Sequence, residues 1–182
     1  IYNHNRNKAV KIGQALTLLS TNSGTPVAII EGQPIGVFYG AFFAVDANGN
    51  AVKNTSGFIQ GERGTQTSAL TYTVQRDPVT GLPISTFPLL RKISGDPNPD
   101  YTASLVNELT YKKASLRVQL DAVQGNEVFN ADWRTRQGVG NGKEAEKEQT
   151  GVYPRGYINN FYALVEQWRI DDGSFVKLRE IS

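Results

Sequence analysis

The chain has 182 residues, 39% of them hydrophobic, which is enough for about one packed domain and excludes wholesale disorder. Its 19 basic and 17 acidic residues leave a formal charge of +2, with neither sign gathered into a long block. We therefore expect no nucleic acid partner, because such partners require a clustered basic face. The absence of cysteine excludes disulfides, thiolate metal sites and a cysteine nucleophile.

The first strand-like segment covers residues 27–45 and is rich in β-branched and aromatic residues. Glycines and a proline interrupt it between residues 32 and 40, so we expect bulges or a bend there. After it, Asp46, Asn48 and Asn50 have the spacing that opens a calcium loop, but the glycine and acidic residue required later in such a loop are missing. A hairpin turn at Asn48-Gly49 explains these residues more simply.

Two long stretches, residues 51–91 and 130–157, show no regular alternation and are interpreted as irregular loops. Loops beyond about 12–15 residues are uncommon in compact domains and are usually functional or mobile. The second loop contains a charged run at residues 143–148, which we interpret as a solvated loop or a short helix.

The clearest strand runs from Ser115 to Ala122, where apolar and polar residues alternate. Residues 103–112 alternate in the same way, with Val106 and Asn107 as the two breaches of the pattern. Only a few residues around Lys112 join the two runs, which predicts a tight antiparallel hairpin.

Residues 159–170 are predicted to form another aromatic-rich strand, and residues 175–181 begin a last one. Turn signals built on Gly, Asn, Asp and Pro recur between all these runs. The predicted fold class is therefore all-β, an antiparallel meander of roughly six to eight strands.

Alternation with charges on one face has two physical explanations. In a soluble sandwich the apolar side covers a core, whereas in a membrane barrel it faces lipid and the polar side lines a wet lumen. No apolar run approaches the roughly 18 residues of a membrane helix, but a barrel strand needs only about 9–11 residues. The short hairpin and its long flanking connections favour the barrel, with Leu116, Val118 and Leu120 facing lipid. The lumen-facing candidates are Arg117, Gln119 and Asp121.

Candidate catalytic groups are sparse, so we predict no enzyme and no cofactor. The only histidine, His4, lies in an Asn- and Arg-rich stretch and has no second histidine with which to bind a metal. Acidic pairs such as Asp171-Asp172 lie in turns, where carboxylates are common. A small hydrolase would need these groups, and nothing in the sequence places them together.

Aromatic residues of the second loop and the strand after it have three interpretations that the sequence leaves open. They are an interfacial girdle, platforms on which sugars stack, or ordinary packing. The residues concerned are Trp133, Tyr153, Tyr157 and Trp168.

Three stretches, residues 31–40, 93–102 and 172–179, together resemble the SusC/RagA-like TonB-dependent transporters of the Bacteroidota outer membrane. The resemblance covers most of the chain, from about residue 5 to 182, and its middle stretch, Gly-Asp-Pro-Asn-Pro-Asp, is the most specific. The motif residues are Gly32, Pro34, Gly36, Phe38, Tyr39, Gly40, Gly95, Asp96, Pro97, Asn98, Pro99, Asp100, Tyr101, Asp172, Gly173, Ser174, Phe175, Leu178 and Arg179. They are interpreted as structural signatures and not as ligand contacts.

The resemblance implies a segment of a 22-stranded transmembrane β-barrel with long extracellular loops, in the outer membrane of a Gram-negative bacterium. Such a transporter imports oligosaccharides or peptides, is capped by a SusD-like lipoprotein, contacts outer-membrane lipid and is driven by the TonB complex. The chain begins at Ile1 and contains no methionine, so residues 1–182 are expected to be a fragment that lacks the plug domain and the final strands. Many family members carry an acidic, calcium-loop-like segment before the second motif; here it is absent, so no metal site is carried over. The rival interpretation is a soluble β-sandwich module that binds carbohydrate.

Overall fold

The computed structural model describes residues 1–19, 27–158 and 165–182, and these are mostly antiparallel β-structure with few helices. This confirms the predicted all-β class. No helix among the described residues is long and apolar enough to cross a membrane. The strands are β1 (Tyr2–Asn3), β2 (Leu16–Leu18), β3 (Val27–Ile30), β4 (Val37–Ala41), β5 (Gly64–Gln66), β6 (Tyr72–Val74), β7 (Arg91–Gly95), β8 (Tyr101–Tyr111), β9 (Ala114–Gln124), β10 (Glu127–Phe129), β11 (Ile170–Asp172) and β12 (Phe175–Ile181). The helices are α1 (Ala131–Gly138), α2 (Glu146–Gln149) and the 3-10 helix η1 (Glu166–Arg169).

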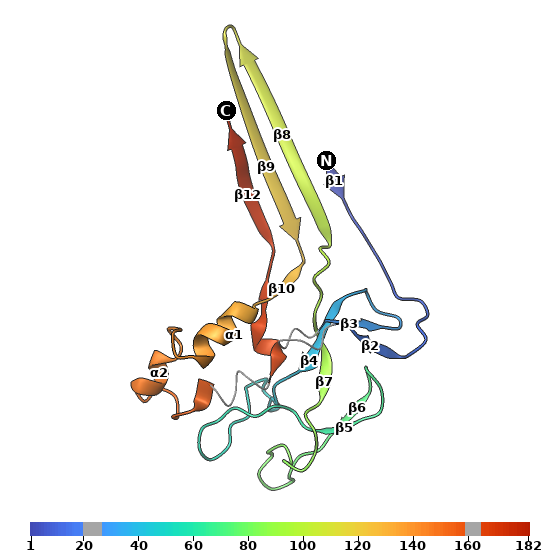
Figure 1. The fold of residues 1–182 in the computed structure, drawn as a ribbon, viewed down its shortest axis with the longest axis vertical. Coiled ribbons are helices and arrows are strands. Elements are labelled where there is room, and N and C mark those ends of the chain that lie inside the picture. Colours follow the sequence, from blue (N-terminus) through green and yellow to red (C-terminus); the bar gives the residue numbers. More distant parts are fainter. Residues whose placement is uncertain (20–26, 159–164) are drawn as a thin grey trace.

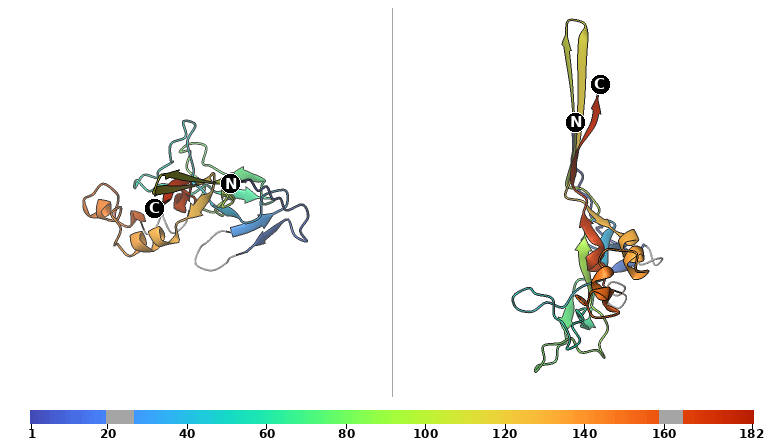
Figure 2. Two further views of the ribbon diagram at one scale, coloured as in Figure 1. Left: turned by 90° about the horizontal axis from the view of Figure 1, so that it is seen from above. Right: turned by 90° about the vertical axis from the view of Figure 1, so that its left-hand side faces the viewer.

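Four of these strands form a long sheet that projects from a more compact base (Figure 1). The long sheet has the order β1-β8-β9-β12, and all its described pairings are antiparallel. The base contains the sheets β2-β3-β4-β7, β5-β6 and β10-β11 together with the helices. In the side view the long sheet is a single thin layer, and both termini lie along it (Figure 2).

The predicted hairpin is confirmed as the β8–β9 pair. Its register is unbroken from Tyr101 opposite Gln124 to Tyr111 opposite Ala114, so the two breaches of the sequence pattern produce no bulge. Lys112, in the two-residue turn, has a φ of 55°, the left-handed region that L-residues rarely adopt. The other connections of the long sheet, through residues 4–100 and 125–174, all return to it at the base end.

The strands of the described residues are divided among four sheets and do not form one continuous meander. Residues 27–45 contribute β3 and β4 to a base sheet, and part of the strand predicted at residues 159–170 is the helix η1. Residues 159–164 lie outside the described part of the chain. Side chains of this helix accept hydrogen bonds from the backbone of β4 and of the segment that follows it: Ala41 N–H donates to Glu166 Oε2 (2.7 Å), and Phe43 N–H donates to Gln167 Oε1 (3.1 Å).

That contact requires the glycine at position 40. A Cβ atom there would lie 2.6 Å from Glu166 Cβ, a distance that packed side chains do not tolerate. The backbone of β4 and η1 can therefore approach closely only because residue 40 has no side chain.

The core of the base lies under β3 and β4. Ala28, Ile30, Val37 and Tyr39 are almost completely buried and form one cluster. In the first long loop, Arg76 forms an ion pair with Glu62, whose side chain is only 4% exposed. The base is thus stabilised by apolar burial and by at least one largely desolvated ion pair.

The turn chemistry predicted near residue 48 is confirmed. Asp46 Oδ1 accepts hydrogen bonds from Asn48 N–H (2.9 Å) and Asn50 N–H (2.8 Å), while Gly49 has a φ of 83°. These bonds close a turn between the bridged residues Val45 and Ala51. Among the described residues, no cluster of three His, Asp or Glu side chains could hold a metal ion.

Candidate functional site

The long sheet has one apolar face that no second layer of the described residues covers. Side chains alternate along each strand, so the register fixes which residues share this face. Leu105 and Leu109 are 61% and 60% exposed, and Leu116, Leu120 and Leu178 are also exposed. The face consists of Ala103, Leu105, Asn107 and Leu109 of β8, Leu116, Val118, Leu120 and Ala122 of β9, and Val176, Leu178 and Ile181 of β12.

A β-bulge keeps this face apolar along β12. The register shifts between Leu178, which lies opposite Leu120, and Glu180, which lies opposite Gln119. Without the extra residue, strict alternation after Leu178 would place Glu180 on the apolar face. The bulge instead puts the neighbouring charges Arg179 and Glu180 on the polar side, and Ile181 returns to the apolar side.

The opposite face carries a connected polar network. Asp121 accepts hydrogen bonds from Ser104 Oγ (2.7 Å), Gln119 Nε2 (3.1 Å) and Arg179 Nε (2.9 Å). Beside it, Arg117 Nε lies 3.7 Å from Glu180 Oε2. The three lumen-facing candidates from the sequence, Arg117, Gln119 and Asp121, thus lie together on this face.

Tyrosines bound the apolar face at both ends. At the base end the rings of Tyr2 and Tyr101 stack, with centroids 5.6 Å apart. At the turn end Tyr111 is 73% exposed, and Lys112 Nζ lies 5.2 Å from its ring centroid. At about 3.3 Å per residue, β8 spans about 33 Å from Tyr101 to Tyr111.

The three motif stretches meet where the long sheet joins the base. Phe38 lies opposite Gly95, and Asn98 Nδ2 donates to Ile35 O (3.0 Å), which joins the first stretch to the second. In the third stretch, Ser174 N–H donates to Asp172 Oδ1 (2.8 Å).

The third stretch is tied to the end of β9. Ser174 Oγ accepts a hydrogen bond from the N–H of Gly125 (3.0 Å), which follows β9. Hydrogen bonds from Ser174 hold the pKa of the Asp172 carboxyl below its ordinary value. These bonds join the third stretch to the end of β9 at the junction.

A cleft of about 390 Å³ lies beside this junction. The segment after β1 contributes His4, Arg6 and Lys8, and the second motif contributes Asp96 and Asp100 on the other side. The His4 ring is hydrogen-bonded to the backbone carbonyl of Asp100, so the histidine anchors the chain here.

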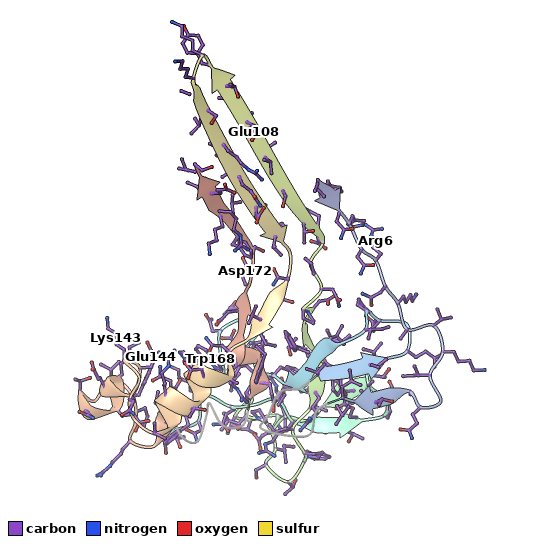
Figure 3. All side chains as sticks on the ribbon, turned by 45° about the horizontal axis from the view of Figure 1, so that its top comes forward. Arg6, Glu108, Lys143, Glu144, Trp168 and Asp172 are labelled. Atoms are coloured by element: carbon purple, nitrogen blue, oxygen red, sulfur yellow. The ribbon has the colours of Figure 1, made fainter. Side chains whose placement is uncertain are left out.

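The four loop aromatics named from the sequence come together in the base. Trp133 of α1, Tyr153 and Trp168 of η1 line one pocket of about 420 Å³, with Glu144, Lys147 and Asp171 as its polar members. Tyr157 is 3% exposed and stacks on Tyr153, with centroids 4.3 Å apart. Figure 3 shows Trp168 and Glu144 close together in the base, far from Glu108 on the hairpin.

Charges in this pocket are partly paired. Lys147 Nζ donates to both carboxylate oxygens of Glu144 (2.8 and 2.7 Å), and these hydrogen bonds raise the pKa of the lysine. The same Nζ lies 5.3 Å from the ring centroid of Tyr153, whose O–H donates to Glu144 Oε2 (3.3 Å). Burial raises the pKa of Tyr157 to about 12.

Asn130 positions the far side of the pocket. Its Oδ1 accepts from Trp133 N–H (2.9 Å) and thereby caps α1, and its Nδ2 donates to Asp171 Oδ2 (2.9 Å). One side chain therefore fixes both Trp133 and Asp171. The amide of Asn130 is neutral, so this hydrogen bond places no cation beside Asp171.

This geometry changes the interpretation of the aromatic residues. Trp133, Tyr153, Tyr157 and Trp168 lie in the base, so they do not flank the apolar band as a girdle would. Tyr2, Tyr101 and Tyr111 lie at the ends of this face instead, and a tyrosine at each end of an alternating run is the sequence signal for them. No protein-family model matches the sequence, and no curated protein matches it either.

Proposed function

We propose that this chain is part of the barrel wall of a TonB-dependent outer-membrane importer of the SusC/RagA-like kind. The observation that carries the proposal is the β8–β9 hairpin. Each strand has 11 residues, one face is apolar and exposed, and tyrosines bound that face about 25 Å apart when a barrel tilt is applied. A transmembrane barrel strand requires about 9–11 residues and an apolar band of about this height.

The connections support the same proposal. Outer-membrane barrels join their strands by short turns on the periplasmic side and by long loops on the extracellular side. The two-residue turn at Lys112-Lys113 would be periplasmic, and the base would be the extracellular loop structure. The bulge in β12 adds support, since it keeps two charges away from the proposed lipid face.

In this proposal the polar face of the sheet borders the transport passage of a 22-stranded barrel. The protein would work by gated passage of oligosaccharides or peptides and not by making or breaking bonds. A SusD-like lipoprotein would cap it, and the TonB complex would act through a plug domain outside residues 1–182. Outer-membrane lipid would cover the row from Leu116 to Leu120.

The rival, a soluble carbohydrate-binding sandwich, is favoured by one observation, the aromatic pocket in the base. It also requires a second sheet packed on the apolar face of the long sheet. The exposure of Leu105 and Leu109 argues against such a layer among the described residues.

Cysteine labelling separates the two proposals, because the chain has no cysteine of its own. The variants Val118→Cys and Gln119→Cys place a thiol at neighbouring positions, one on each face of β9. In intact outer membranes, a water-soluble maleimide should modify the second variant and spare the first, and both should react after denaturation. Equal labelling of both positions in membranes would refute the barrel proposal.

A further inference from the structure

The aromatic pocket of the base has the features of a binding site in its own right. Three rings, those of Trp133, Tyr153 and Trp168, line a space of about 420 Å³, and no residue of the long sheet contributes to it. The negative face of an aromatic ring attracts cations within about 6 Å of its centroid, most strongly for tryptophan. The pocket already shows this chemistry, because Lys147 Nζ lies 5.3 Å from the Tyr153 centroid.

The formal charges of the lining leave a net negative charge. Glu144 is neutralised by Lys147, which donates to both of its carboxylate oxygens. Asp171 instead accepts a hydrogen bond from the neutral side-chain amide of Asn130 (2.9 Å), which brings no compensating positive charge. One carboxylate charge beside three electron-rich rings therefore suits a single positive ligand charge.

We propose that this pocket binds one organic ammonium group, with Asp171 supplying the counter-charge and Trp133, Tyr153 and Trp168 the ring faces. The inference does not depend on the membrane proposal, because the described residues that line the pocket all lie in the base. Its failure would leave the labelling experiment above unaffected, and the reverse also holds.

Intrinsic fluorescence offers a direct test, because Trp133 and Trp168 are the only tryptophans of the chain. The purified chain in detergent would be titrated with choline and, in parallel, with 3,3-dimethylbutan-1-ol, its neutral isostere. Choline should produce a saturable change with a millimolar dissociation constant, and the isostere should bind at least about threefold more weakly. Saturation-transfer NMR on the choline methyl groups provides a second readout that needs no fluorescence change.

Two variants should shift choline affinity in opposite directions. Asp171→Asn keeps the acceptor for Asn130 but removes the charge, so it should weaken binding about three- to tenfold. Lys147→Gln removes the internal cation and leaves Glu144 uncompensated, so it should strengthen binding. Asp132→Asn is the matched control, since Asp132 pairs with Arg136 outside the pocket and should change nothing.

Three results would each overturn the proposal. Equal responses to choline and its isostere would mean that the pocket recognises shape without charge, and would overturn the proposal. So would an affinity that Asp171→Asn and Lys147→Gln leave unchanged, provided that both variants keep the near-ultraviolet circular dichroism of the parent chain. Absence of both a fluorescence change and saturation transfer would overturn it as well.

Discussion

Placing a charge on the proposed lipid face provides the most demanding test of the membrane assignment. Val118 lies opposite Asn107, one residue from the middle of the span between Tyr101 and Tyr111. An arginine at this position would therefore enter a bilayer close to its midplane, where the expected cost is roughly 2–4 kcal/mol. That cost corresponds to a roughly 30- to 1,000-fold loss in the ratio of folded to unfolded protein.

The matched control is Gln119→Arg, which adds the same charge one residue away on the polar face, beside Asp121 and Glu180. It should change the free energy of unfolding by no more than about 0.5 kcal/mol. Both variants would be reconstituted in phospholipid vesicles and unfolded in urea, with the loss of β-structure followed by far-ultraviolet circular dichroism.

A soluble protein would give a different result. Val118 is only partly buried within the described residues, so in water its replacement by arginine should change the free energy of unfolding by no more than about 0.5 kcal/mol. If Val118→Arg and Gln119→Arg proved equally stable in vesicles, the apolar face would not contact hydrocarbon, and the barrel proposal would be refuted.

Three further substitutions test the fold by equilibrium unfolding. Lys112→Gly should raise the free energy of unfolding by roughly 0.5–1 kcal/mol, because glycine adopts a positive φ without strain, whereas Lys113→Gly in the same turn should lower it; the reverse order would contradict the turn geometry. Gly40→Ala should lower the free energy of unfolding by about 1–3 kcal/mol, because the new Cβ would push the 3-10 helix away from β4. Gly13→Ala, with nothing within 4 Å of the new Cβ, should leave the free energy of unfolding nearly unchanged. Similar losses for both variants would show that the close approach at Gly40 is unimportant. Glu62→Gln should lower the free energy of unfolding by about 2–3 kcal/mol. This is somewhat less than for a fully buried ion pair, because the arginine partner is 25% exposed, and a change below about 0.5 kcal/mol would contradict the burial of the pair.

The hairpin shows how far the sequence alone predicts this structure. Alternation over residues 103–122 is long and has only two breaches, so the strands, their partner and their two faces follow from local pattern. The breaches leave the strand pairing unchanged, because alternation simply places Val106 on the polar face and Asn107 on the apolar face without shifting the register. A pattern this long outweighs two exceptions.

The bulge in β12 could not be predicted in the same way. Leu178, Arg179, Glu180 and Ile181 violate strict alternation, and the sequence does not say which residue is the extra one. The pairing with β9 decides it, because Arg179 reaches Asp121 and Glu180 reaches Arg117 only when both lie on the same face.

The aromatic pocket is the clearest case of a site decided by tertiary structure. The sequence identified its four aromatic residues but left three interpretations open, and it gave no reason to group Asp171 or Lys147 with them. Contacts among residues up to 38 positions apart, from Trp133 to Asp171, bring them together, and Asn130 holds two of them.

The sequence by itself thus determined the all-β class, the long hairpin and the polarity of its two faces, because alternation, β-branched residues and turn residues act over a few neighbouring positions. Only the tertiary structure decided that residues 27–45 join a base sheet, that η1 replaces part of a predicted strand, and that the motif stretches meet at one junction. These outcomes depend on long-range steric fit, such as the approach of η1 to Gly40, which leaves no periodic signal in the chain.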